Sequence, residues 1–305
     1  MSILLHQRTR RAAVWAATLA ITLAALAAPT PKAHTAEDAP DISAAKRIVA
    51  VGGSITEIVY ALGEEGRLAG RDSTSVYPEQ AFQLPDVGYM RQLSPEGVLS
   101  VSPDAILMLE GSGPPTAIDV LGKASVPLVT IPESFDEAGI LGKIETVGAA
   151  SMSALTSADS LPALSGTPSA ALASTAGIAD RKRVLFVLSM QGGKVLASGT
   201  GTAADGIIKM AGGVNVVTEF PGYKQLTDEA VITSKPDLIL MMTRTGDHAA
   251  DNSQLLAHPA VSQTPAAQNN AILRMDGAYL LGFGPRTAGA VRDLAKALYG
   301  DRVSH

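Results

Sequence analysis

Residues 93–108 read LSPEGVLSVSPDAILM, and residues 226–241 read LTDEAVITSKPDLILM. The second stretch repeats the first at a constant offset of 133 residues, and a Gly-Tyr pair precedes each copy. A repeat at so long an offset indicates two similar units, because a solenoid repeats over far fewer residues. Each copy combines a helix-capping residue, a short helix, a Pro-Asp turn and an apolar strand. We therefore predict two similar α/β lobes with a ligand-binding cleft between them.

The first lobe opens with the pattern of a strand, a glycine turn and a helix. Residues 46–51 contain a short apolar run, Gly52-Gly53-Ser54 follows, and residues 55–63 have helical spacing. Ser54 and Glu57 have the spacing of a capping box, which predicts Ser54 as the N-cap. This order is typical of an open α/β sheet. The glycine turn lacks the spacing of a dinucleotide or P-loop fingerprint, so it does not indicate phosphate binding.

Composition divides the rest of the chain into two lobes and a connector, each lobe with a central, mainly parallel sheet and flanking helices. We assign residues 42–148 to the N-terminal lobe and 181–301 to the C-terminal lobe. Residues 149–180 are rich in Ala and Ser and are predicted to connect the lobes, in part as helix. Further elements are expected as strands at 105–109, 127–131, 184–188, 238–242 and 271–275, and as helices at 203–210 and 287–299.

The N-terminus has the features of an export signal. Arg8, Arg10 and Arg11 precede an uncharged apolar run at residues 12–28. We expect residues 1–36 to be a signal peptide and a short tail outside the fold, cleaved near Ala27 or Ala36, with the mature chain in the periplasm. The apolar run is short for a membrane span, and an anchoring helix is the alternative interpretation.

Charge and cysteine content narrow the class of protein. The chain has 24 Lys and Arg, 29 Asp and Glu, and no cysteine. Removal of residues 1–36 takes away four basic residues and no acidic one, which leaves 20 against 29 and a net charge of −9. Nucleic acid is therefore not an expected partner, because binding phosphates requires a basic face. Without cysteine there is neither a disulfide nor a lipid-anchored cysteine.

Several segments, in the same order over residues 46–299, together resemble one family. They are Gly88-Tyr89-Met90-Arg91-Gln92-Leu93-Ser94, Gly111-Ser112-Gly113-Pro114, Gly199-Thr200-Gly201-Thr202-Ala203-Ala204-Asp205, Gly222-Tyr223-Lys224 and Leu280-Leu281-Gly282-Phe283-Gly284-Pro285-Arg286-Thr287. This chain resembles the periplasmic haem-binding proteins of bacterial haem ABC importers. The wider class, clamp-like binding proteins for siderophores, cobalamin and haem, shares the lobes and the Pro-Asp strands. The Ala/Ser-rich connector departs from the family, in which a longer helix joins the lobes.

The resemblance implies ferric haem (ferric protoporphyrin IX) as the transported ligand and Tyr89 as the protein ligand of its iron. A phenolate is a hard anionic donor that suits ferric iron, and a nearby cation favours its ionised form. Arg91 is placed to supply that cation or to bind a haem propionate in a bidentate fork, and Arg244 to do the same from the second lobe. Without the resemblance, we would interpret Tyr89 as a loop aromatic that covers the core, and Arg91 as a charged residue exposed to solvent.

Other residues of the same segments have two interpretations each. Tyr279 either lines the cleft or packs, and Arg286 either binds a propionate or positions the last helix. Tyr223 is either a second ligand or, as we favour, a packing aromatic. His248 is either a distal contact or solvent-exposed.

Glu96 and Glu229 occupy matching positions in the two copies of the repeat. Each falls two residues after a predicted N-cap, where the helix dipole favours a carboxylate. In the class that the chain resembles, one acidic residue on each lobe docks onto the membrane permease. We therefore expect an inner-membrane ABC permease and ATPase complex as partner, an outer-membrane haem receptor system as a source of ligand, and a monomeric protein.

Two rival functions are open. A siderophore or cobalamin carrier would use the same fold, although the only tryptophan, Trp15, falls in the predicted signal peptide. A zinc or manganese carrier would need a histidine-rich cluster that the mature chain can hardly build. A periplasmic hydrolase is disfavoured, because the sequence has no G-x-S-x-G elbow, no cysteine nucleophile and no His-centred triad. We predict a binding protein and not an enzyme.

Overall fold

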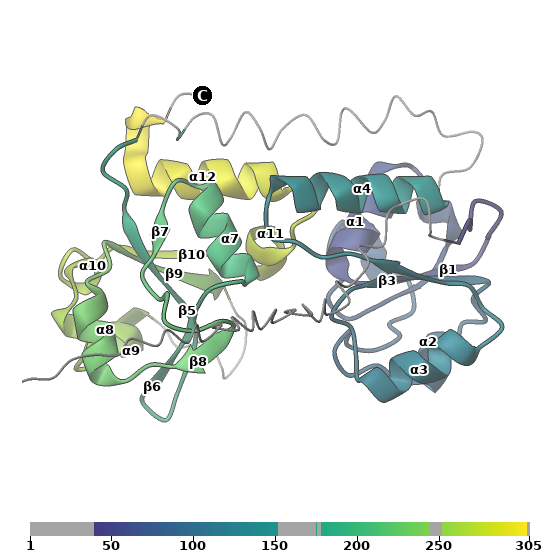
Figure 1. The fold of residues 1–305 in the computed structure, drawn as a ribbon, viewed down its shortest axis with the longest axis horizontal. Helices are drawn as coiled ribbons and strands as arrows, with labels where there is room; N and C mark the ends of the chain where they lie inside the picture. The colour runs from purple at the N-terminus through teal and green to yellow at the C-terminus, as the bar shows by residue number, and fades with distance from the viewer. Residues whose placement is uncertain (1–39, 152–174, 176–177, 244–251, 304–305) are drawn as a thin grey trace, which may run out of the picture. The chain divides into compact units, whose positions relative to one another are not determined.

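The structure, a computed structural model, describes residues 40–151, 175, 178–243 and 252–303. The described residues form two α/β lobes, each built on its own sheet (Figure 1). The predicted signal peptide lies outside the described residues. So does most of the predicted connector, whose first three residues complete a helix of the first lobe.

Four parallel strands form the sheet of the first lobe. They are β1 (Ile48–Val51), β2 (Leu68–Arg71), β3 (Ala105–Leu109) and β4 (Leu128–Ile131), in the order β2-β1-β3-β4. Every residue of β1 and β3 is buried, because helices cover both faces of such a sheet, and these segments are accordingly apolar throughout. The helices are α1 (Gly53–Ala61), α2 (Pro95–Leu99), α3 (Pro115–Lys123) and α4 (Glu137–Ser151).

The sheet of the second lobe is mixed. Its strands are β5 (Arg183–Gln191), β6 (Lys194–Ser198), β7 (Val214–Asn215), β8 (Tyr223–Gln225), β9 (Leu238–Thr243) and β10 (Ile272–Asp276), in the order β10-β9-β5-β6-β8 with β7 also paired to β5. β10, β9, β5 and β7 pair in parallel, and β6 and β8 are antiparallel. The helices are α7 (Ala203–Met210), α8 (Asp228–Ser234), α9 (Asn252–Ala257), α10 (Pro265–Gln268), α11 (Gly277–Leu281) and α12 (Thr287–Tyr299).

The apolar core is continuous between the lobes. β5 alternates between two clusters: Val184 and Phe186 belong to a large cluster that also includes Ile48 of the first lobe, while Leu185 and Val187 belong to a smaller cluster on the other face. The large cluster therefore holds the two lobes together, since burial of apolar surface is the main stabilising term in folding.

The predicted α/β fold with two similar lobes is confirmed, and so are the helix caps of the repeat. Ser94 accepts a hydrogen bond from the backbone N–H of Gly97 at the start of α2, and Thr227 accepts one from Ala230 at the start of α8. The capping box at Ser54 is wrong. Helix α1 already begins at Gly53, after Gly52 with φ of 118°, a conformation that favours glycine. Within the described residues, no helix is long and apolar enough to cross a membrane.

Candidate functional site

Tyr89 lies on a loop whose backbone is fixed by hydrogen bonds. Its carbonyl accepts from the N–H of Gln92 at 2.8 Å, and the carbonyl of Met90 accepts from Gly113 at 2.9 Å. Met90 is buried in the core, whereas Tyr89 is 41% exposed. The loop therefore presents a phenol to solvent from a well-anchored backbone.

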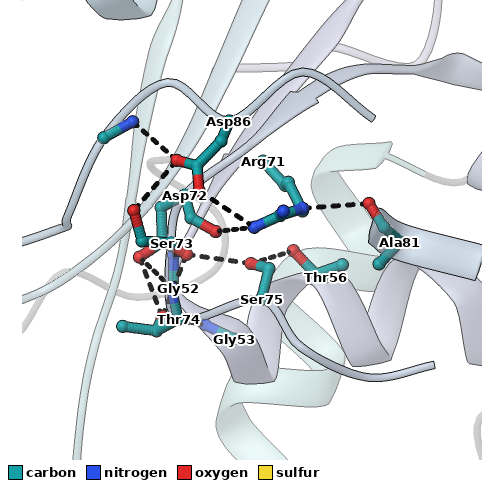
Figure 2. A network of polar contacts seen from close by, with 11 residues as sticks. Gly52, Gly53, Thr56, Arg71, Asp72, Ser73, Thr74, Ser75, Ala81 and Asp86 are labelled. Atoms are coloured by element: carbon teal, nitrogen blue, oxygen red, sulfur yellow. Dashed lines mark hydrogen bonds and ion pairs between the residues drawn. The ribbon is translucent and has the colours of Figure 1, made fainter. Parts of the chain in front are cut away.

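A buried carboxylate ties the glycine turn to the segment that follows β2. Asp72 has no exposed surface and accepts from the backbone N–H groups of Gly52 and Thr74, each at 3.0 Å, and from the hydroxyl of Ser75 at 2.8 Å (Figure 2). The Ser75 hydroxyl is also bonded to that of Thr56 in α1 at 2.7 Å. These contacts fix the carboxyl ends of β1 and β2, the edge at which open α/β sheets bind ligands.

Arg91 follows Tyr89 by two residues on the same loop. It is exposed, and its charge acts on the hydroxyl of Tyr223 in β8. Burial of that hydroxyl raises the pKa of Tyr223, and hydrogen bonds with Thr202 and Ser198 together with the Arg91 charge oppose the rise. The ring of Tyr223 packs edge-on against Phe186, with centroids 6.4 Å apart. The charge of Arg91 in the first lobe thus favours ionisation of Tyr223 in the second, but burial outweighs it.

Arg286 forms an ion pair that joins the lobes. Its Nε and Nη2 donate to the two carboxylate oxygens of Glu57 in α1, at 2.9 and 2.5 Å, in a bidentate geometry. Its guanidinium also lies over the ring of Tyr77, 3.7 Å from the centroid. Two of its nitrogens therefore already have a carboxylate partner, and the predicted propionate contact of Arg286 stays a prediction in which the propionate would compete with Glu57.

Tyr279 in α11 is held by the last helix. Its hydroxyl donates to Asp293 at 2.9 Å, and its ring lies 5.4 Å from the guanidinium of Arg286. Burial, followed by the hydrogen bond and charge of Asp293, raises the pKa of Tyr279 to about 12. Tyr279 is thus a neutral hydrogen-bond donor at physiological pH.

A buried lysine, absent from the predictions, makes a second polar contact between the lobes. Lys143 in α4 is 1% exposed, and its Nζ donates to Glu133 at 2.7 Å, to the Ser54 hydroxyl at 3.2 Å and to the carbonyl of Phe283 in the second lobe at 3.0 Å. Burial lowers the pKa of Lys143 and raises that of Glu133. The Ser54 hydroxyl therefore accepts a hydrogen bond from Lys143 and does not form the helix cap that the sequence predicted.

A sequence signal for this lysine existed. Ile140, Lys143, Ile144 and Val147 have the spacing of one helical face, and all four are buried. A lone lysine among apolar residues on such a face needs a buried acceptor. Only the structure could show that part of the acceptor set comes from the other lobe.

The two glutamates of the repeat are both exposed and occupy equivalent positions. Glu96 lies in the first turn of α2 and Glu229 in the first turn of α8. Neither makes an ion pair among the described residues. Their carboxylates are therefore accessible to a partner, one on each lobe.

Three residues remain: two of the predicted candidates, and His258, a histidine of the second lobe that was not among them. Arg244 and His248 lie outside the described residues. His258 is 8% exposed, with Nε2 2.7 Å from the carbonyl of Gly193 and Nδ1 accepting from Ala260, which is a structural role. In the described part of the chain, no cluster of three or more His, Cys, Asp or Glu side chains is arranged to hold a metal ion.

Two lobes on separate sheets, with exposed tyrosines at matching positions, define a ligand-binding protein of the two-lobed kind. The family comparison agrees: the profile of the periplasmic binding protein family matches residues 48–279. The chain belongs to this family. It is accordingly an extracytoplasmic binding protein and not an enzyme.

Three similar proteins illustrate the relationship. The solved structure of the periplasmic haem-binding protein BhuT in complex with two haems is 37% identical, covers 85% of this chain and 99% of that one, and superposes with a TM-score of 0.76. An ABC transporter substrate-binding lipoprotein of Bacillus subtilis, YvrC, is 25% identical over 84% of this chain and 81% of its own length. A vitamin B12-binding protein of Yersinia pestis is 26% identical over 65% of this chain and 70% of its own. The chain is therefore a substrate-binding protein of an ABC transporter.

Proposed function

We propose that this chain binds ferric haem between its lobes, with Tyr89 as the axial iron ligand, and delivers it to an inner-membrane ABC importer. The observation that carries the proposal is the exposed Tyr89 phenol on an anchored loop, with the exposed cation Arg91 two residues further along the chain. The similarity to a haem-binding protein at 37% identity over nearly its whole length supports the same ligand.

The chemistry of haem matches these side chains. A phenolate oxygen is a hard donor for ferric iron. The rings of Tyr89 and Tyr223 are both partly exposed and supply flat apolar surface for a porphyrin face. Arg91 and Arg244 are the proposed partners of the propionates, since Arg286 is already paired with Glu57. Tyr279 is proposed to line the site beside Arg286.

Delivery is proposed to use Glu96 and Glu229. One exposed carboxylate at the start of a helix on each lobe forms a symmetric pair of contacts for basic pockets on the two permease subunits. We propose that the protein acts as a monomer and that its haem comes from an outer-membrane receptor system.

Haem titration of purified protein tests the ligand and its axial residue together. We expect a Soret shift and the charge-transfer bands of a high-spin tyrosinate complex in the wild type and in Tyr223→Phe, and loss of those bands in Tyr89→Phe. Tyr223→Phe is a matched control, because it removes the same hydroxyl from the equivalent position of the other lobe. Absence of a Soret shift in every protein would refute haem binding, and loss of the bands only in Tyr223→Phe would move the iron ligand to the second lobe.

Charge reversal tests the docking pair. We expect the double variant Glu96→Lys, Glu229→Lys to bind haem as the wild type does but to abolish importer-dependent haem uptake. A matched double variant, Glu145→Lys, Glu219→Lys, reverses one exposed glutamate on each lobe away from the repeat and should leave uptake intact. Normal uptake by the first double variant would refute this docking assignment.

Cobalamin or a siderophore is the second candidate ligand, favoured by the similarity to a vitamin B12-binding protein. The two ligands differ in what they require of Tyr89: a cobalt corrin carries its own axial base, whereas ferric haem needs one from the protein. Competition of hydroxocobalamin or a ferric siderophore against bound haem separates them. Displacement of haem at stoichiometric concentration would favour the alternative.

A further inference from the structure

Two hydrogen bonds hold the residue that precedes Tyr89. Gly88 has φ of 109°, in the region that favours glycine, and a Cβ atom built on it would meet no atom within 4 Å. Its N–H donates to Oδ1 of Asp86 at 2.9 Å, and its carbonyl accepts from the N–H of Ser73 at 2.9 Å. Glycine has the largest conformational freedom of any residue, so these two bonds determine the direction in which the chain enters Tyr89.

Asp86 is the centre of this arrangement. Besides the N–H of Gly88, its carboxylate accepts from the hydroxyl of Ser73 at 2.9 Å and from Nη1 of Arg71 at 3.3 Å (Figure 2). Ser73 thus contacts both the carboxylate and the Gly88 carbonyl. One side chain therefore joins the Tyr89 loop, through Gly88, to two residues at the end of β2, Arg71 and Ser73.

Arg71 keeps that carboxylate in place. It is 7% exposed, its Nε donates to the carbonyl of Ala81 at 3.0 Å, and its Nη1 also donates to the carbonyl of Asp72 at 3.0 Å. Its guanidinium lies 5.1 Å from the ring centre of Phe82. Because these contacts hold its guanidinium, Arg71 presents its charge to Asp86 at a defined position. A lysine exposed to solvent would not.

We propose that Asp86, backed by Arg71, is a positioning residue for Tyr89: it fixes the Gly88 peptide so that the phenol oxygen is held where the haem iron binds. The inference rests on the proposed role of Tyr89. Side chains that orient a metal ligand are worth about 10–100-fold in metal affinity when removed. Loss of Asp86 removes one of the two hydrogen bonds that hold Gly88, and the phenolate then has to be ordered at the expense of binding free energy.

Two substitutions at Asp86 separate its contacts. Asp86→Ala removes all three hydrogen bonds, and we expect ferric haem to bind about 10–100-fold more weakly, with altered tyrosinate charge-transfer bands. Asp86→Asn retains an acceptor for Gly88 and Ser73 but turns an amide donor toward Arg71, so its effect should be smaller. Asp104→Ala is the matched control, because Asp104 also accepts two backbone N–H bonds in the same lobe, from Lys46 and Arg47. It should lower thermal stability and leave the haem spectrum unchanged.

Amide hydrogen exchange of the haem-free protein gives a readout that does not depend on the ligand. In Asp86→Ala we expect faster exchange at the Gly88 and Ser73 amides, whose acceptors are lost or displaced, with the core of β1 unchanged. Unchanged exchange at both amides would overturn the proposal even if no haem binds. If the wild type shows bands that Tyr89→Phe abolishes, but Asp86→Ala has wild-type bands and affinity, the positioning role fails while the proposed function stands. If the bands survive in Tyr89→Phe, the proposed function fails instead.

Discussion

Compared lobe by lobe, the Pro-Asp turn makes the same contacts in both copies of the repeat. The carboxylate of Asp104 accepts the N–H of Arg47 at 2.9 Å, and that of Asp237 accepts the N–H of Arg183 at 2.8 Å. The backbone returns the contact, since the N–H groups of Asp104 and Asp237 donate to the carbonyls of the same arginines at 3.0 and 2.8 Å. In each lobe one aspartate thus joins the start of a central strand to the start of its neighbour.

The two arginines complete the equivalence. The Nε of Arg47 donates to the carbonyl of Ser102 at 3.0 Å, and Nη2 of Arg183 donates to that of Ser234 at 2.7 Å. The chain turns there through a residue with positive φ, Ser102 at 50° and Lys235 at 41°. Each arginine satisfies carbonyls that the end of a short helix leaves unpaired. The repeat therefore encodes a structural framework.

The two copies of the repeat differ outside this framework, at the tyrosine that precedes each copy. Tyr89 lies on a loop attached to β2 by side-chain hydrogen bonds, whereas Tyr223 lies in β8, paired with Ser198 of β6; both rings are partly exposed, but the hydroxyl of Tyr223 is hydrogen-bonded to Thr202 and Ser198. A phenol that already has hydroxyl partners is a poorer candidate for an iron ligand than one that faces solvent. Equivalent positions in a duplicated framework thus carry different chemistry, and the proposed function places the ligand on the first lobe alone.

Lys143 has the largest expected effect, because it belongs to one lobe and bonds to both. Lys143→Met should lower the free energy of unfolding at pH 7 by about 3 kcal/mol, since it leaves the Glu133 carboxylate without its cation in a partly buried site. Burial already raises the pKa of Glu133, so the carboxyl protonates more readily as pH falls and the deficit should shrink toward pH 5. Chemical denaturation at both pH values measures this.

Lys209 provides the control within one lobe. Its Nζ pairs with Asp205 at 2.7 Å, but its side chain is 62% exposed, so Lys209→Met should cost less than about 1 kcal/mol. Equal losses for the two lysines would show that the contact between the lobes adds nothing to stability. Because the chain has no cysteine, pairs of engineered cysteines can also report whether Lys143→Met changes the distance between the lobes.

Truncation of the two aspartates tests the shared framework. Asp104→Ala and Asp237→Ala should each lower the free energy of unfolding by about 1–3 kcal/mol, because the first leaves two backbone N–H groups, and the second one, without a charged acceptor. The contact through Arg47 or Arg183 is common to both, so losses of similar size are expected, with the larger one at Asp104, which also accepts the N–H of Lys46. A loss in one lobe more than twice that in the other would break the comparison. Backbone hydrogen bonds hold the pKa of Asp104 below its usual value despite the opposing effect of burial, so its stabilisation is present at neutral pH and is lost as pH falls through that lowered pKa.

The local elements were predictable because their signals are local. The caps at Ser94 and Thr227, the apolar strands and the final helix each depend on a few neighbouring residues. The contacts between the lobes were not predictable. Glu57 and Arg286 are 229 positions apart, and in its local sequence each is an ordinary charged residue, either exposed to solvent or close to a helix terminus. The Ser54 capping box failed for the same reason, since a lysine 89 positions away takes its hydroxyl.

Tyr279 should titrate at an unusually high pH for a tyrosine. With the pKa of Tyr279 raised to about 12 by burial and by Asp293, the folded state binds this proton more tightly than the unfolded state does. Its contribution to stability is therefore complete below pH 10 and is lost as pH rises toward 12. Tyrosinate absorbance during an alkaline titration should lose its latest step in Tyr279→Phe, which at pH 7 costs about 1 kcal/mol. An unchanged latest step would contradict the assignment.

The helix caps have the smallest expected effect and compare the copies most directly. Ser94→Ala removes the acceptor of the Gly97 N–H at 2.9 Å, and Thr227→Ala removes that of the Ala230 N–H at 3.2 Å. Each should lower the free energy of unfolding by about 0.5–1 kcal/mol, with no effect on haem affinity, because both helices are short and their caps are exposed. Replacement by aspartate should restore stability in both lobes, since a carboxylate also caps and interacts favourably with the helix dipole. Rescue in one lobe only would mean that the two copies have diverged in framework as well as in binding surface, and the docking glutamates that follow these caps would then not be equivalent.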